Sequence, residues 1–127
     1  MPSEQVPKWF VLTGGPSSGK SEVLKELRAR GHKVLPEVTR EVLRRYMKRG
    51  LLREEILRTQ ETAFQRELFE RGLAVERKLP RNRVFFLDRG VPDSIPYYRK
   101  TGMDPKEVQQ VGRGRYHTVF FMEQLPF

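Results

Sequence analysis

One segment near the N-terminus restricts the fold of this chain more than any other. Residues 10–21 read FVLTGGPSSGKS, so an apolar run passes abruptly into glycines, serines and one lysine. Gly14, four further residues, and then Gly19, Lys20 and Ser21 match the pattern G-x-x-x-x-G-K-[ST] of a phosphate-binding loop. That pattern is a strong signal where a strand precedes it and a helix follows it.

Both flanking elements are predicted by the sequence. Residues 9–13 (WFVLT) have the short, apolar and aromatic character of a buried strand. Residues 18–30 carry Val23, Leu24 and Leu27 at helical spacing. The alternative, a glycine turn that merely joins a strand to a helix, is disfavoured by this context.

A loop of this kind binds phosphate through its backbone. Glycines allow N–H groups to turn inward, and the helix that follows adds unpaired N–H groups and a partial positive charge. We expect Lys20 to bridge the terminal phosphates of a nucleotide and the Ser21 hydroxyl to bind Mg²⁺. The residues expected to hold the nucleotide are Gly14, Gly15, Pro16, Ser17, Ser18, Gly19, Lys20 and Ser21.

Short apolar runs alternate with helical patterns along the rest of the chain. Strands are expected at 33–36, 84–88 and 117–122, the last two reading VFFLD and HTVFFM. Helices are expected before Gly50, from 54 to about 78, from about 93 and from about 104. This alternation predicts an α/β fold with a parallel sheet, and 127 residues correspond to a single domain.

Acidic side chains end two of the predicted strands, where open parallel sheets bind their ligands. Asp88 follows VFFL and has the position of an acid that holds Mg²⁺. Arg89 beside it can neutralise charge on a transferring phosphoryl group, and Glu37 can accept a proton from an acceptor hydroxyl. Structural alternatives remain open: an Asp88–Arg89 pair can order the turn, and Glu37 can complement a helix dipole.

Charge and composition narrow the class of partner. A formal net charge of +9 favours nucleotides, nucleic acid or acidic membranes, although the basic stretch at 33–49 is equally typical of a solvated helix face. The absence of cysteine excludes disulfides and thiolate sites. No apolar run approaches the ~18 residues of a membrane span and no secretory leader is recognisable, so we expect a cytoplasmic protein without a membrane partner.

Five segments together resemble a known family. They read GGPSSGKS, PEVTREVL, TQETAFQRE, FFLDRGVPDSIPYYR and RYHTVFFMEQLPF. Their order is similar to that of bacterial AAA-type ATP-binding domains related to the nicotinamide-riboside kinase domain and, more distantly, to that of the deoxynucleoside kinases. The resemblance covers residues 9–127 and implies a three-layer P-loop NTPase fold with four parallel strands in the order 2-3-1-4.

The resemblance also implies roles for individual residues. It places ATP phosphates on the loop, Mg²⁺ near Ser21 and Asp88, and a catalytic base at Glu37. An acid-arginine pair followed by a Tyr-Arg helix is matched by Asp88, Arg89, Tyr98 and Arg99. Arg40 and Gln60 are further candidates for contacting an acceptor, although polar side chains on helices are usually solvated.

We therefore expect a Mg²⁺-ATP-binding protein that transfers a phosphoryl group to a small, nucleoside- or riboside-like metabolite. The alternative is an ATPase or NTP-binding regulatory module without an acceptor, and a nucleic-acid-binding or end-processing kinase is less favoured. In the related proteins a lid and a fifth strand follow the LPF ending. We thus expect a domain that is C-terminally incomplete, or completed by a partner or a second copy, with low turnover in the isolated chain.

Overall fold

The computed structural model describes residues 6–15, 17–59 and 61–126. These residues form two compact units. Unit 1 comprises residues 6–36, 80–90 and 112–126, apart from residue 16, and unit 2 comprises residues 37–79 and 91–111, apart from residue 60. The expectation of one domain over residues 1–127 stays a prediction.

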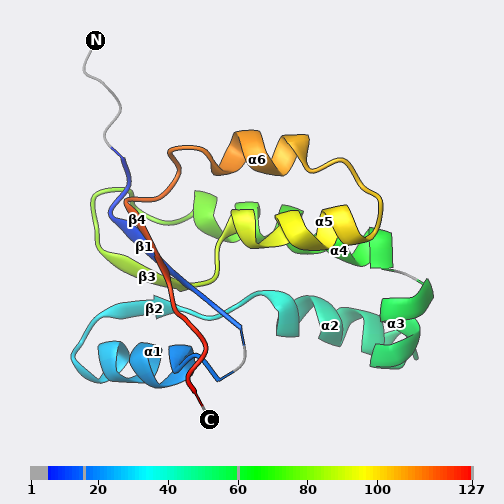
Figure 1. Ribbon diagram of the computed structural model, residues 1–127, viewed down its shortest axis with the longest axis horizontal. Coiled ribbons are helices and arrows are strands. Elements are labelled where there is room, and N and C mark those ends of the chain that lie inside the picture. The colour runs from blue at the N-terminus through cyan, green and yellow to red at the C-terminus, as the bar shows by residue number, and fades with distance from the viewer. Residues whose placement is uncertain (1–5, 16, 60, 127) are drawn as a thin grey trace. The chain divides into compact units, whose positions relative to one another are not determined.

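Unit 1 is a parallel sheet with one helix. Its strands lie in the order β2-β3-β1-β4, and every pairing is parallel (Figure 1). The predicted α/β class and the strand order 2-3-1-4 are therefore confirmed. The elements are β1 (Trp9–Thr13), α1 (Lys20–Ala29), β2 (Lys33–Leu35), β3 (Phe85–Asp88) and β4 (Thr118–Phe121).

Strand β1 is the most buried strand of this sheet, and like β3 it has a neighbouring strand on each side. Trp9, Val11 and Leu12 are each no more than 3% exposed. The register places Leu12 level with Asp88 at the end of β3. The Arg89 N–H then donates to the Leu12 carbonyl at 2.9 Å, so the chain leaving β3 runs beside the chain that enters the loop.

Unit 2 is helical. Its elements are α2 (Thr39–Lys48), α3 (Arg53–Thr59), α4 (Glu61–Arg77), the 3-10 helix η1 (Val91–Ser94), α5 (Ile95–Lys100) and α6 (Lys106–Gly112), whose last residue is counted with unit 1. Two apolar clusters hold these elements together. One is formed by Val42, Tyr46, Ile56 and Phe64, and the other by Phe69, Leu73, Val91, Tyr98 and Val108.

The helical pattern expected from residue 54 to about residue 78 corresponds to α3 and α4, and residue 60 between them lies outside the described residues. Ile56 of α3 and Phe64 of α4 pack in the same cluster with residues of α2. The helical spacing of the apolar residues therefore indicated side chains that are buried in this cluster. Among the described helices, none has the length and apolar character of a membrane span.

Candidate functional site

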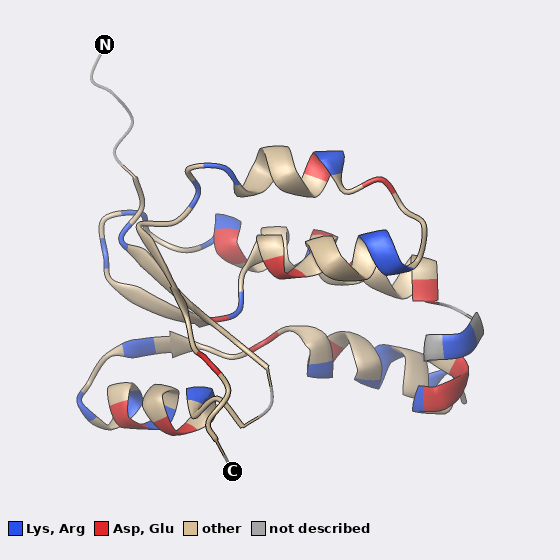
Figure 2. Ribbon diagram, in the orientation of Figure 1, with Lys and Arg blue, Asp and Glu red and all other residues tan. Residues whose placement is uncertain are grey.

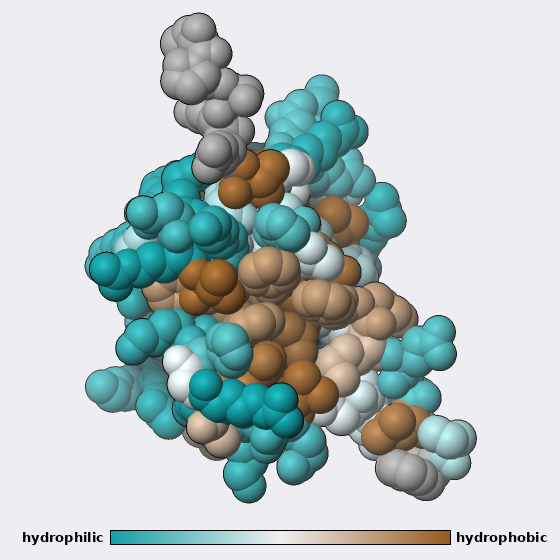
Figure 3. Space-filling view, turned by 90° about the vertical axis from the view of Figure 1, so that its left-hand side faces the viewer, coloured by the Kyte–Doolittle hydropathy of each residue, from teal (hydrophilic) through white to brown (hydrophobic). Residues whose placement is uncertain are grey.

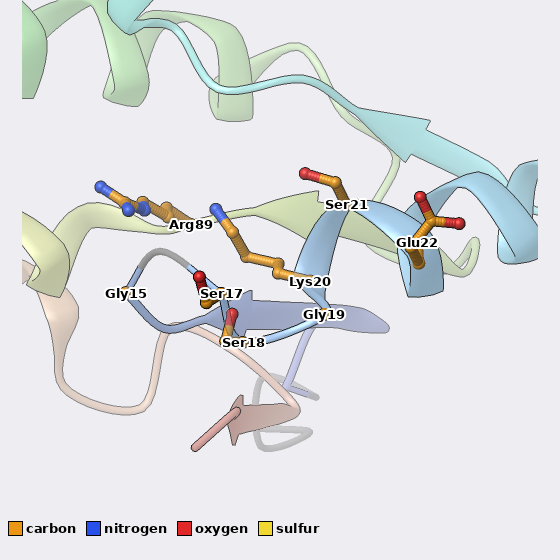
Figure 4. A pocket seen from close by; sticks show the side chains of 8 residues that line it. All are labelled: Gly15, Ser17, Ser18, Gly19, Lys20, Ser21, Glu22 and Arg89. Carbon is orange, nitrogen blue, oxygen red and sulfur yellow. The ribbon is translucent and has the colours of Figure 1, made fainter. Parts of the chain in front are cut away.

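The loop between β1 and α1 lines a cavity of about 510 Å³ within unit 1. This volume is in the range of small-molecule sites. Figure 4 shows that Lys20 and Ser21 extend from the start of α1, while Arg89 reaches the same region from the end of β3. The lining residues are Gly15, Ser17, Ser18, Gly19, Lys20, Ser21, Glu22 and Arg89.

The backbone of this loop explains its glycines. A Cβ atom on Gly14 would lie 2.6 Å from the Met122 carbonyl oxygen, so the neighbouring chain leaves no room for a side chain. Gly19 has a φ of 81°, in the left-handed region. Ser17 and Arg89 adopt left-handed φ values of 62° and 66° despite their side chains, at a cost of about 1–2 kcal/mol each. Such residues concentrate at functional sites.

The N-terminus of α1 is open to an anion. Its N-cap is Gly19, and no side chain caps the helix, so the first-turn N–H groups have no side-chain acceptor there. The Ser18 hydroxyl beside them is buried, in a residue only 5% exposed, and has no hydrogen-bond partner within the described structure. Unpaired donors at the positive end of a helix are suited to bind phosphate oxygens.

Lys20 and Asp88 form an ion pair across this site. Their side chains are 11% and 23% exposed, so the two charges are largely shielded from water and attract each other more strongly than a surface pair does. Asp88 ends β3, which lies beside β1. The pairing therefore brings together the lysine and the acid that the sequence singled out 68 positions apart.

The donor set around the loop fits Mg²⁺. The Ser21 hydroxyl and the Asp88 carboxylate offer the oxygen ligands that this ion prefers. No group of three or more histidine, cysteine or acidic side chains suited to a metal ion occurs among the residues that the structure describes. A magnesium ion here would take its remaining ligands from phosphate and water, which is its usual behaviour at nucleotide sites.

Arg89 is held against the loop by a hydrogen bond. Its Nη2 atom donates to the Gly14 carbonyl oxygen at 3.2 Å, and the residue is half-buried in the wall of the cavity. The guanidinium is thereby positioned next to the predicted phosphate positions. A fixed cation in a partly water-excluded site can stabilise charge that develops on a phosphoryl group.

The other predicted site residues lie in unit 2. The Glu37 carboxylate accepts a hydrogen bond from the Thr39 hydroxyl at 2.7 Å, and Arg40 and Arg99 are exposed. Tyr98 is 4% exposed and packs edge-on against Phe69 in the core of that unit, and burial raises the pKa of Tyr98. Their roles toward an acceptor stay predictions, and Pro16 and Gln60 lie outside the described residues.

Glu22 is a lining residue that the sequence analysis did not single out. It is exposed and lies in the first turn of α1, three positions after Gly19. Its position directly after the motif was the available signal, because residues that follow the serine of such a loop continue along the same helix turn. An acidic side chain there complements the helix dipole and also limits how much negative charge the cavity accepts.

A comparison with protein families matches residues 9–127 to an AAA domain. No curated protein matches the chain. The family match agrees with the loop, the parallel sheet and the acid at the end of β3, and it does not extend to the narrower resemblance to riboside or deoxynucleoside kinases. Because the match covers nearly the whole sequence, this chain belongs to the AAA domain family and is a nucleotide-binding P-loop protein.

Proposed function

We propose that this protein binds Mg²⁺-ATP in the cavity of unit 1 and transfers the γ-phosphoryl group to a small hydroxyl-bearing metabolite. The observation that carries the proposal is the Lys20–Asp88 ion pair in a cavity also lined by Arg89. A lysine, an acid and an arginine at one phosphate loop are the groups that phosphoryl transfer requires. The sequence resemblance to riboside and deoxynucleoside kinases supports a nucleoside- or riboside-like acceptor.

The loop residues have the task of binding and neutralising the phosphates. The N–H groups at the start of α1 and the Ser18 hydroxyl bind phosphate oxygens, and the Lys20 ammonium moves from Asp88 to the terminal phosphates. Asp88 is then available, together with Ser21, to bind Mg²⁺, which neutralises charge on the bound triphosphate.

The transfer itself needs little covalent chemistry from the protein. The acceptor hydroxyl oxygen attacks the γ-phosphorus, the bond from this phosphorus to the bridging oxygen of ADP breaks, and ADP leaves with that electron pair. The hydroxyl proton passes to a carboxylate, for which Glu37 and Asp88 are the two candidates. Arg89 stabilises the charge on the transferring group, and Arg40, Gln60, Tyr98 and Arg99 are the candidates for acceptor contacts.

The proposal is tested by measuring ADP formation with a panel of nucleosides, ribosides and vitamins, with products identified by mass spectrometry. Two results are expected. ADP should form only with one class of acceptor, and a phosphorylated product of the matching mass should appear. Arg89→Ala should lower that rate by about 100-fold or more, while Arg44→Ala, which changes an exposed arginine of α2, should not. ATP hydrolysis at the same rate with every acceptor and in the absence of any acceptor would show that the protein is an ATPase and not a kinase.

A further inference from the structure

The N-terminal ends of the four strands carry a second charged surface. Because the strands are parallel, their starts lie along one edge of the sheet, opposite the edge that holds the phosphate loop. Figure 2 shows basic residues on the segments that lead into the strands. We call this set the basic rim, and it consists of Lys8, Lys33, Arg81, Arg83, Arg113 and Arg115, all exposed except the half-buried Arg115.

The segments that carry the basic rim contain basic residues and no acidic ones, and the Arg115 guanidinium lies 5.9 Å from the centroid of the Trp9 ring. Residues 6–8, 31–33, 80–84 and 112–117 contain no aspartate or glutamate. Helix α2 differs in this respect, because its Arg45 pairs with Glu41 at 3.3 Å. The rim therefore has the charge distribution of a surface that attracts an extended polyanion.

A row of aromatic rings lies on one face of the sheet next to the basic rim. Phe10 and Phe86 are register partners, with ring centroids 5.5 Å apart and planes within 29°. Phe120 follows Thr118, the β4 partner of Phe10, by two residues and therefore shares this face, with its centroid 6.4 Å from that of Phe10. His32 lies 5.2 Å from Phe86 and His117 4.7 Å from Phe10, which completes what we call the aromatic row.

The aromatic row is accessible to a ligand in unit 1. His32 and His117 are exposed, Phe120 is 47% exposed, and Phe10 and Phe86 are half-buried. Apolar surface bordered by hydrophilic side chains is visible in the space-filling view (Figure 3). The rings of Phe10, Phe86 and the two histidines thus lie near the starts of the strands, where the cations are, and Phe120 lies further along β4, level with Leu12.

We propose that the basic rim and the aromatic row bind single-stranded nucleic acid. The charge of the rim is complementary to a phosphodiester backbone, and arginine matches phosphate oxygens with paired N–H donors. The rings offer stacking positions for unpaired bases, and four strands at about 4.8 Å spacing span roughly 14 Å, enough for a few nucleotides. This site goes beyond the proposed function, because it uses no residue of the phosphate loop.

An anionic membrane surface fits these observations less well. Membrane binding by a basic patch requires apolar side chains that project past the cations into the bilayer. Here the rings form a cluster in which Phe10 lies beside Phe86, His117 and Phe120, with centroids 4.7–6.4 Å apart. Aromatic rings beside cations are the arrangement that stacks bases along a positively charged groove.

The contribution of the basic rim is tested by fluorescence anisotropy with a fluorescein-labelled dT20 oligonucleotide. Binding is measured between 50 and 300 mM KCl, a range around the ~0.15 M physiological ionic strength. The Arg83→Gln/Arg113→Gln double variant should bind more weakly, with a salt slope smaller by about 1.4, since each phosphate contact contributes about 0.7. The Arg44→Gln/Lys48→Gln double variant removes the same charge from exposed positions of α2 and should bind like the unmodified protein. Equal loss in both double variants would overturn the proposed location.

The stacking component is tested by a matched pair on β4. Phe120→Ala should weaken dT20 binding about 5- to 140-fold without a change in salt slope, because stacking is worth about 1–3 kcal/mol per base. Val119→Ala changes the neighbouring residue, 51% exposed and on the opposite face, and should leave binding unchanged. Equal effects of the two substitutions would contradict a role for the aromatic row.

Three further results distinguish an oligonucleotide site from the phosphate loop, from a lipid-binding surface and from a dimer interface. Lys20→Ala should keep dT20 binding while it loses ATP binding. The oligonucleotide site and the phosphate loop can therefore be confirmed or rejected independently. No change in anisotropy at 50 mM KCl would overturn the proposal, as would binding to phosphatidylglycerol vesicles without binding to dT20. Light scattering that shows a dimer dissociated by Phe120→Ala, with no oligonucleotide binding, would assign this face to self-association instead.

Discussion

Lys20, the first residue of α1, forms an ion pair with Asp88, the last residue of β3. Both side chains are largely shielded from water, so their attraction is screened less than that of a surface pair. A nucleotide phosphate that enters the cavity competes with Asp88 for the Lys20 ammonium. Nucleotide binding is thereby coupled to release of the carboxylate that is proposed to bind Mg²⁺.

Asp88→Asn should separate the two effects of this carboxylate. Without Mg²⁺, the variant should bind ATP at least as tightly as the unmodified protein, because Lys20 no longer has to leave a charged partner. The increase in ATP affinity that Mg²⁺ produces should be about 10- to 100-fold smaller in the variant than in the unmodified protein. This is the effect expected for loss of one charged ligand worth about 1.5–3 kcal/mol. Titration calorimetry with EDTA or MgCl₂ measures both quantities.

The control for this prediction is Glu123→Gln, which removes an exposed carboxylate of unit 1 outside the cavity. It should leave both affinities unchanged. A magnesium effect of equal size in the unmodified protein and in Asp88→Asn would remove Asp88 from the metal site.

Gly14 and Gly15 should respond differently to the same substitution. Gly14→Ala should lower the free energy of unfolding by about 1–3 kcal/mol, because its Cβ would meet the Met122 carbonyl oxygen and the backbone directly after β4 must shift. Gly15→Ala has no atom within 4 Å of the added Cβ and should be close to neutral. Urea denaturation compares the two variants, and equal unfolding midpoints would contradict this account of the loop.

Arg89 allows a comparison of backbone and side-chain effects at one position. Its φ of 66° suits glycine, so Arg89→Gly should be more stable than Arg89→Ala by about 1 kcal/mol. Both variants lack the guanidinium and should lose phosphoryl transfer to the same extent. Denaturation curves and ADP formation measure the two properties, and an Arg89→Ala variant as stable as Arg89→Gly would show that the backbone there is unstrained.

Glu41 should make the stability of unit 2 depend on pH. The Arg71 guanidinium, 2.9 Å away, holds the pKa of Glu41 below its ordinary value of 4.5, with a smaller contribution from Arg45. Because the folded pKa is the lower one, the stabilisation is present above pH 4.5 and is lost as the pH falls through the folded pKa. The charges are largely exposed, so the contribution is at most about 1 kcal/mol.

Glu41→Gln measures this contribution. The variant should unfold at a lower urea concentration than the unmodified protein at pH 7, and the difference should shrink as the pH is lowered below 4.5. Glu54→Gln, an exposed glutamate of α3, is the matched control and should show no such trend. A difference that grows on acidification would have the wrong sign for the Glu41–Arg71 pair.

The elements around the phosphate loop were predictable from the sequence because their signals are local. Strand β1 has the predicted bounds Trp9–Thr13, and β3 ends at Asp88 as the VFFLD segment indicated. Tyr98 shows what a local pattern does not carry. Its role toward an acceptor stays a prediction, and its buried ring packs against Phe69, which is 29 positions away in the sequence.

The basic rim was not predictable from any single segment. The sequence suggested the stretch at 33–49 as the main basic region, whereas rim residues such as Lys8, Arg81 and Arg83 come from separate parts of the chain. They share an edge only because the strands that follow them are parallel and ordered β2-β3-β1-β4. Local sequence patterns do not show which distant segments become neighbours. The strand order of the folded chain shows that these segments do.

The central claim is that the loop of unit 1 binds nucleotide phosphates through Lys20. The most direct test is calorimetric titration of Mg²⁺-ATP into the unmodified protein, into Lys20→Ala and into Lys25→Ala, whose substitution removes an exposed lysine of the same helix. Circular dichroism checks that all three are folded. We predict binding to the unmodified protein and to Lys25→Ala, and at least about tenfold weaker binding to Lys20→Ala, since a charged hydrogen bond is worth about 1.5–3 kcal/mol. Equal ATP affinity of folded Lys20→Ala and the unmodified protein would contradict the claim.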